Sequence, residues 1–180
     1  MDRDAQLEVE DIENWERNYG PIPEGAILIM FSGTGQHYGN RTAYFGWPSG
    51  MEQNNPNDTE NLHFPGISSK AAEWLVTYRT IYGTGVDTAS GDYGQSRDFK
   101  THQIFGEHNN WGIENLNNVD KLPPKGFLLY NMVTKIRDGS GGPSRVIAIL
   151  DNSSNGGSFK TKPSAILSMM LSILILHKLY

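Results

Sequence analysis

The sequence predicts one globular domain with an α/β fold, in which helices and strands are mixed along the chain. Short apolar runs typical of buried strands alternate with segments whose apolar residues recur at helical spacing. The 20 glycines and 9 prolines predict many turns. A hydrophobic content of 37% in 180 residues is enough for a core and argues against a disordered chain.

The expected elements follow from apolar periodicity and turn residues. Helices are expected over residues 7–19 and 67–82, and strands over residues 26–31, 83–87, 127–133 and 145–150. Gly20 ends the first helix, and Ser68 or Ser69 can cap the second. The glycine loop 138–143 joins the last two strands into a hairpin, with 145–150 as a buried strand. Residues 32–61 are expected to be mainly loop.

Charge and cysteine content exclude several function classes. The formal net charge of −5, without a basic patch, argues against a nucleic-acid partner. The absence of cysteine excludes disulfides, thiolate nucleophiles and cysteine-ligated zinc. The remaining candidates for chemistry are histidines, carboxylates and serines.

His102 and Glu114, twelve positions apart in the stretch 93–122, are the strongest candidates for chemistry. A helix before the interval and a strand after it could each present one metal ligand. An imidazole and a carboxylate suit zinc or manganese, but a hydrolytic metal needs three or more such ligands and an open position. By spacing alone Glu107 and His108 are equal alternatives, and so are ordinary surface positions.

Other patterns in the sequence point to weaker possibilities. Gly33, Gly35 and Gly39 could form a phosphate cradle, but their spacing fits no nucleotide fingerprint and indicates a glycine-rich turn. Asp87 and Asp92 follow a predicted strand and either function in a site or cap turns.

A serine nucleophile is the other enzymatic option. A Ser-His-Asp mechanism could use one of four serines, but none lies in a Gly-x-Ser-x-Gly turn: Ser68, Ser90, Ser96 and Ser140. We therefore favour the metal hypothesis over this one.

Four segments, in order, resemble the cyclase-type metal hydrolases, a family that includes metal-dependent kynurenine formamidases and isatin hydrolase. They are PGISSKAAEWLV, GTGVDTASGDYGQSRDF, THQIFGEHNNWGIENLNNVDKLPPKG and IRDGSGGPSRVIAIL. The earlier stretch WERNYGPIPEGAILIMFSGTGQHYGNRTAYFG is similar to the family's helix-then-strand segment, so the resemblance covers residues 12–151. It implies a swivelling β/β/α fold, here incomplete at the N-terminus, and a homodimer.

The resemblance also implies ligands and an activity. Two of the family's metal ligands, a His and a Glu twelve apart, fall on His102 and Glu114, and the metal would be zinc or manganese. The family's other ligand motif, His-x-x-x-His-x-Asp, does not occur in this sequence. We therefore expect an N-terminally shortened chain, inactive by itself, with catalytic residues unknown.

The implied substrate is a small aryl formamide or cyclic amide. The leading hypothesis is an arylformamidase-type enzyme of tryptophan catabolism, which would hydrolyse N-formylkynurenine to kynurenine and formate. The alternative is a non-catalytic remnant or dimerising binding module of the same fold.

The C-terminal region predicts a separate segment with its own role. We expect the hydrolase-like domain over residues 1–151, a polar linker over 152–164 and a hydrophobic tail over 165–180. The small residues 155–157 followed by an apolar end of about a dozen residues resemble a glycolipid-anchor signal. A C-terminal helix or a short tail anchor are the alternatives.

Three Asn-x-Ser/Thr sequons, at Asn40, Asn57 and Asn152, agree with passage through the secretory route. With a signal peptide upstream, the full-length product would be extracellular or attached to the cell surface through its C-terminal tail.

Overall fold

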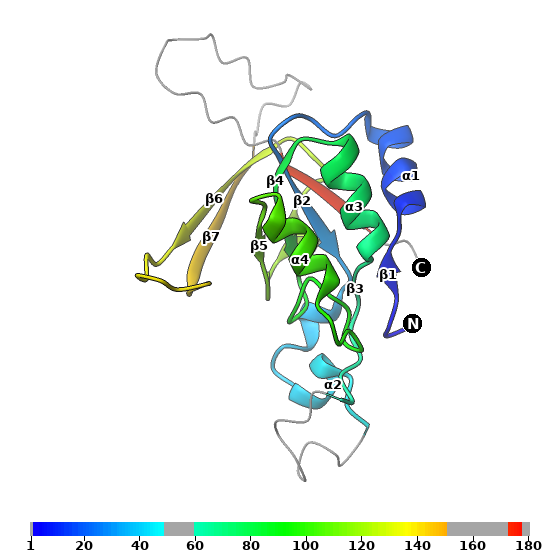
Figure 1. The fold of residues 1–180 in the computed structure, drawn as a ribbon, viewed down its shortest axis with the longest axis vertical. Coiled ribbons are helices and arrows are strands. Elements are labelled where there is room, and N and C mark those ends of the chain that lie inside the picture. The colour runs from blue at the N-terminus through cyan, green and yellow to red at the C-terminus, as the bar shows by residue number, and fades with distance from the viewer. Residues whose placement is uncertain (1, 49–59, 151–172, 178–180) are drawn as a thin grey trace.

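The structure is a computed structural model that describes residues 2–48 and 60–150, together with the backbone of residues 173–177 (Figure 1). Its elements are β1 (Gln6–Leu7), α1 (Val9–Tyr19), β2 (Ala26–Phe31), η1 (Thr34–His37), α2 (Arg41–Phe45), β3 (Gly66–Ile67), α3 (Ser69–Tyr78), β4 (Ile81–Val86), α4 (Lys100–Glu107), β5 (Trp111–Ile113), η2 (Val119–Lys121), β6 (Phe127–Val133), β7 (Ser144–Leu150) and β8 (Ile173–His177). The expected α/β class is confirmed.

A four-stranded parallel sheet in the order β5-β4-β2-β8 forms the centre of the molecule. Strand β2 has a neighbour on each side, and its residues from Ala26 to Met30 are at most 1% exposed. A strand buried on both faces has no polar face to present, which explains why AILIMF is a continuous apolar run. The expected buried strand is confirmed.

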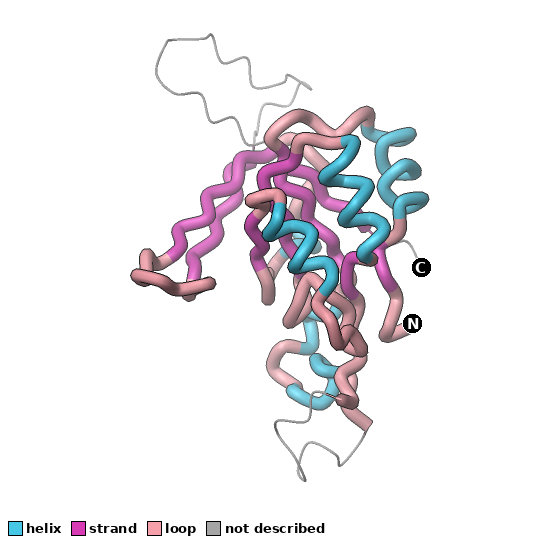
Figure 2. The backbone as a smooth tube through the Cα atoms, viewed as in Figure 1, coloured by secondary structure: helices cyan, strands magenta, loops and turns pink. Residues whose placement is uncertain are grey.

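The two faces of β2 belong to two different hydrophobic clusters, because successive side chains on a strand point to opposite sides. Leu28 and Met30 pack with buried residues of α1, α3 and α4. Ile27 and Ile29 pack on the other face with Phe127, from the base of the β6–β7 hairpin. Helices α1, α3 and α4 therefore lie on the opposite side of the sheet from the hairpin (Figure 2).

The expected hairpin is confirmed, but the expected burial of its second strand is wrong. Strands β6 and β7 pair antiparallel from Phe127 opposite Leu150 to Val133 opposite Ser144. Ile147 and Ile149 are 44% and 47% exposed, because the hairpin extends away from the helices and only the inner face at its base meets the core (Figure 2). Its outer face is apolar and open to solvent.

For the helix expected over residues 67–82, the predicted N-cap is confirmed, but the predicted C-terminal end is wrong. The Ser68 hydroxyl accepts a hydrogen bond from the Ala71 N–H, as an N-cap does. The helix ends at Tyr78, and Ile81 already belongs to β4. Between them Arg79 takes an extended conformation, which starts the connection into the sheet. The stretch 32–61 also contains more structure than expected, namely η1 and α2.

Where the structure describes the C-terminal region, it forms a strand and not the helix that was one of the alternatives to an anchor signal. Residues 173–177 form β8, a parallel strand that pairs with β2 in register from Ile27 opposite Ile173 to Phe31 opposite His177. The predicted linker 152–164 and the first part of the tail lie outside the described residues, as do the sequons at Asn57 and Asn152. Within the described part of the chain, no helix is long and apolar enough to cross a membrane.

An ion pair between α1 and Arg79, the C-cap residue of α3, predicts acid sensitivity. Glu16 accepts hydrogen bonds from Arg79 Nε at 2.8 Å and Nη2 at 2.6 Å, and its side chain is 13% exposed. The hydrogen bond from Arg79 lowers the pKa of Glu16, outweighing its burial, with help from the Ile22 N–H. A lowered carboxyl pKa stabilises the fold above the ordinary value of 4.5, and this contribution is lost as the pH falls through the folded-state pKa.

We therefore expect the Glu16→Gln variant to be less stable than wild type by about 1 kcal/mol at pH 6, and this difference to shrink as the pH falls below 4.5. Urea denaturation over a series of pH values measures this difference. The exposed Glu24→Gln variant is the control and should follow wild type throughout. A constant gap between Glu16→Gln and wild type would contradict the assignment.

Candidate functional site

Polar side chains follow three neighbouring strands of the sheet, each at the carboxyl end. Ser32 follows β2, Asp87 follows β4 and Glu114 follows β5. Because the strands are parallel, these residues lie at one edge of the sheet, where α/β folds bind their ligands. The candidate site therefore lies at this edge.

Asp87 holds the glycine-rich turn that follows β2. Its carboxylate is 1% exposed and accepts hydrogen bonds from the Ser32 N–H and hydroxyl, both at 2.8 Å, and from the Gly35 N–H at 3.1 Å. A Cβ on Gly35 would lie 3.2 Å from the Asp87 Cβ, so glycine lets the turn come this close. The N–H groups that could have held a phosphate bind the chain's own carboxylate.

Backbone and side-chain contacts hold the segment that carries Glu114 against the end of β4. The Asn115 N–H donates to the Thr88 carbonyl at 2.9 Å, and Asn115 itself has a positive φ of 57°. The buried Tyr44 hydroxyl donates to Asn115 Oδ1 at 2.6 Å. Burial, and then the charge of Asp87, raise the pKa of Tyr44, so its hydroxyl remains a donor. Tyr44 and Asn115 were not predicted, since nothing in the sequence links two residues so far apart.

Asp92 fixes the position of His102. Its carboxylate, 3% exposed, accepts the backbone N–H groups of Thr101 at 2.9 Å and His102 at 3.2 Å, so it caps the first turn of α4. The same carboxylate contacts His102 Nδ1 at 2.5 Å. The sequence left open whether Asp92 is a functional or a capping residue. In the structure its carboxylate both caps α4 and contacts the His102 imidazole.

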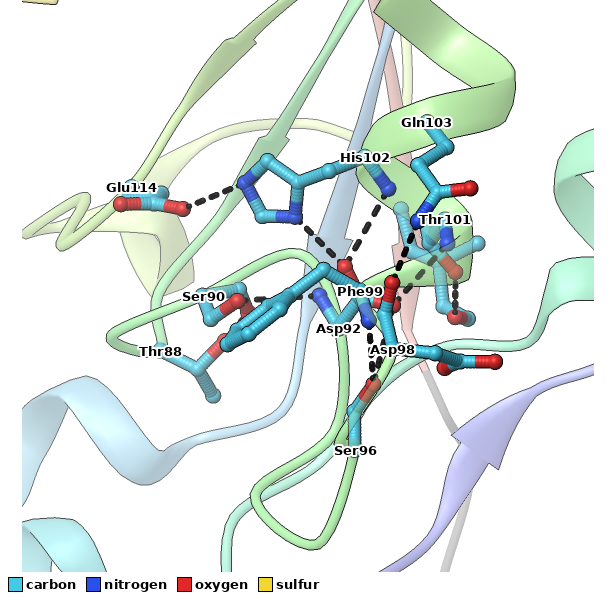
Figure 3. Close-up of polar contacts among 11 residues, drawn as sticks. Thr88, Ser90, Asp92, Ser96, Asp98, Phe99, Thr101, His102, Gln103 and Glu114 are labelled. Carbon is cyan, nitrogen blue, oxygen red and sulfur yellow. Dashed lines mark hydrogen bonds and ion pairs between the residues drawn. The ribbon is translucent and has the colours of Figure 1, made fainter. Parts of the chain in front are cut away.

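His102 and Glu114 come together at the site, as their spacing suggested. The His102 Nε2 atom lies 3.2 Å from Glu114 Oε1, on the side of the imidazole away from Asp92 (Figure 3). The side chains of His102 and Glu114 are 49% and 38% exposed, so both can be reached from solvent. Their role as metal ligands stays a prediction.

The two carboxylates keep the imidazole charged. The hydrogen bond to Asp92, and then the one to Glu114, raise the pKa of His102 to about 10. Burial by itself would raise the pKa of Asp92, but hydrogen bonds from His102 and from the Thr101 and His102 N–H groups lower it overall. The imidazole thus lies between two carboxyl groups that both favour its protonated form.

This arrangement fits a divalent metal in orientation but not in ligand number. Metal-bound histidines commonly donate one ring N–H to a carboxylate and offer the other nitrogen to the metal, as the contact with Asp92 allows here. Glu114 would supply an oxygen beside that nitrogen. Among the residues that the structure describes, no group of three or more His, Asp or Glu side chains could hold a metal.

The alternative candidates lie apart from this pair. His108 follows α4, and its Nδ1 contacts the Ile104 carbonyl at 2.9 Å, while Glu107 is the exposed last residue of that helix. Ser68 caps α3 and contacts Glu8, and the Ser90 hydroxyl accepts the Asp92 N–H. These contacts give the serine hypothesis no support.

An open cleft of about 1420 Å³ adjoins the site. His102 and Glu114 line it together with Ile113 from the sheet, and Asn131 and Val146 line it from the hairpin. A small molecule could therefore reach both side chains from the space between sheet and hairpin.

The parallel sheet with helices packed on one face defines an α/β protein whose paired imidazole and carboxylate lie at the carboxyl ends of its strands, and comparisons with known proteins give the family. The Cyclase family model matches residues 1–93. The isatin hydrolase of Roseibium aggregatum is 30% identical over 153 residues, which cover 83% of this chain and 54% of that protein. This chain belongs to the cyclase family.

Solved structures show the same relationship. Isatin hydrolase A from Ralstonia solanacearum matches with a TM-score of 0.73 and 31% identity, over 82% of this chain and 54% of that one. An isatin hydrolase bound to the product analogue thioisatinate matches with a TM-score of 0.72 and 30% identity, over 82% of this chain and 53% of that one. The chain spans about half the length of these relatives, and the cyclase-like fold that the resemblance implied is confirmed.

Proposed function

We propose that this chain contributes half of the active site of a metal-dependent amide hydrolase. The observation that carries the proposal is the contact between His102 and Glu114 at the carboxyl ends of the parallel strands. A bound zinc or manganese ion would polarise the amide carbonyl and activate water for attack on it. The remaining ligands would come from residues outside the described ones.

The chain's own residues would have distinct roles in such a site. Asp92 would hold the imidazole through Nδ1 and so direct Nε2 toward the cleft, while Glu114 would add a carboxylate oxygen. The positive charge of His102 is shared between two carboxylates, so release of its proton would have to accompany metal binding. Tyr44 and Asn115 would keep the Glu114 segment in place.

The substrate we propose is an amide attached to an aromatic ring. N-formylkynurenine, the arylformamidase substrate, is the first candidate. A cyclic aryl amide is the second, and the similarity to isatin hydrolases supports it. Both would be opened or cleaved by the same addition of water to a carbonyl carbon.

A chimera tests the proposal. The N-terminal half of the Ralstonia solanacearum isatin hydrolase is joined to this chain, and hydrolysis of isatin and N-formylkynurenine is measured with Zn²⁺ or Mn²⁺. We expect metal-dependent turnover that falls about 100-fold or more in His102→Ala and Glu114→Gln, because each removes a ligand. The chain by itself should give no turnover above the blank.

Matched controls use the two residues that sequence spacing could not separate from this pair. The Glu107→Gln and His108→Gln chimeras should keep rates within about twofold, because both positions lie apart from the site. A folded, metal-loaded chimera that hydrolyses neither compound would contradict the proposal, and so would full activity without His102.

The second candidate is a non-catalytic module that forms a homodimer. The observation that favours it is the apolar outer face of the β6–β7 hairpin. Tyr130, Ile147 and Ile149, which lie on that face, are each more than 40% exposed. Sedimentation of wild type and an Ile147→Lys, Ile149→Lys variant would test it, since only the wild type should dimerise.

A further inference from the structure

Phe99 has an uncommon position at the start of α4. Its φ of 50° and ψ of 44° place it in the left-handed region, which is unfavourable for a bulky side chain. Among the described residues, the other non-glycine positions with positive φ are all asparagine or aspartate: Asn109, Asn115, Asn118 and Asp138. Those residue types tolerate this conformation, and phenylalanine does not.

Neither capping nor core packing explains the aromatic ring. Phe99 occupies the N-cap position of α4 but has no capping side chain, and the cap is supplied by Asp92 instead. Phe99 is 55% exposed, so its contribution to the core is small. The chain therefore holds a large apolar ring in solvent, on a strained backbone, with no gain in stability from either source.

The ring lies beside the candidate ligand. The centroids of the Phe99 and His102 rings are 6.3 Å apart with an interplanar angle of 83°, an edge-on arrangement. In Figure 3 both rings extend in the same direction from the start of α4. The backbone is tied down there, because the Phe99 N–H donates to the Ser96 hydroxyl at 3.2 Å.

We propose that Phe99 is a specificity residue that contacts the aromatic ring of the substrate while His102 and Glu114 act at its amide. This inference rests on the proposed function and names one side chain that recognises the aryl group. An aromatic ring offers edge-on or offset contact to a second ring, which an alkyl group cannot match. The strain at residue 99 would be retained because it directs the ring toward the bound substrate.

Binding of two small probes to the full chain tests the proposal without any turnover. Anthranilate carries an amine and a carboxylate on an aromatic ring, and β-alanine carries the same groups with no ring. Their dissociation constants are measured by NMR titration in zinc-free buffer. We expect wild type to bind anthranilate more tightly than β-alanine. In the Phe99→Leu variant the ratio of the two dissociation constants should shrink about two- to tenfold.

The Phe99→Asn variant separates recognition from structure. Asparagine suits the left-handed conformation, so this variant should unfold at an equal or higher urea concentration than wild type while losing the aryl preference. Tyr78→Leu removes another exposed aromatic ring, on α3 next to the start of β4, and should leave the preference unchanged.

An aryl preference that survives in both Phe99 variants would overturn the proposal, and so would a wild type that binds neither probe or binds both equally. The chimera assay reports separately on the proposed function. An inactive chimera beside a Phe99-dependent preference would count against hydrolysis alone.

Discussion

Replacing Asp92 with alanine is expected to lower the free energy of unfolding by about 3 kcal/mol, because four contacts to one buried carboxylate, including a long one from the Ser96 hydroxyl, are lost together. Two N–H groups in the first turn of α4 lose their cap, and the charged His102 imidazole loses its closest partner. The His102 side chain is half exposed, so water can replace part of that last contact.

Urea denaturation measures the change, and Asp98→Ala is the matched control. Asp98 belongs to the same loop and its residue is exposed, so its variant should stay within about 0.5 kcal/mol of wild type. A second readout is specific to the contact with the imidazole. The pKa of His102, raised to about 10 chiefly by Asp92, should fall toward its ordinary value in Asp92→Ala. An unchanged unfolding midpoint and an unchanged His102 titration would contradict this role of Asp92.

Most of the central elements could be predicted from residues that are close together in the sequence. The continuous apolar run of β2, the Ser68 cap and the glycine loop between β6 and β7 are decided by residues close to one another in sequence. Such features need no knowledge of the tertiary fold. The pairing of His102 with Glu114 was also within reach, because a helix followed by a parallel strand brings the two element ends to one edge of the sheet.

Features that depend on tertiary packing were not predicted. Ile147 and Ile149 are exposed because of the direction in which the hairpin leaves the sheet. The apolar pattern of the sequence does not predict that direction. Helix α3 ends at Tyr78, where Arg79 turns into an extended conformation and pairs with Glu16 of α1. Tyr44 reaches Asn115 across 71 positions of sequence. One sequence alone gives no signal for such contacts.

Strand β8 gives the second large prediction, because two roles compete for the same residues. As an anchor signal the apolar tail would be removed from the mature protein. In the structure, five of its residues, Ile173–His177, pair with β2 and complete the sheet on that side. Loss of the tail would turn β2 into an edge strand with unpaired backbone groups.

We therefore expect a chain that ends at residue 172 to be less stable than the full chain by about 3 kcal/mol or more, since several backbone hydrogen bonds are lost at about 1 kcal/mol each. Urea denaturation measures the loss, and hydrogen exchange of the β2 amides locates it. A chain that ends at residue 177 keeps β8 and is the control.

The same pair of truncations distinguishes the two roles of the tail. If β8 stabilises the sheet, only the shorter chain should show faster exchange in β2 and aggregate through its open edge. Equal stability of both truncations would mean that the domain does not need β8, and removal of the tail for attachment to a lipid would then be compatible with the fold. A large loss would instead mean that anchor processing and a complete central sheet exclude each other.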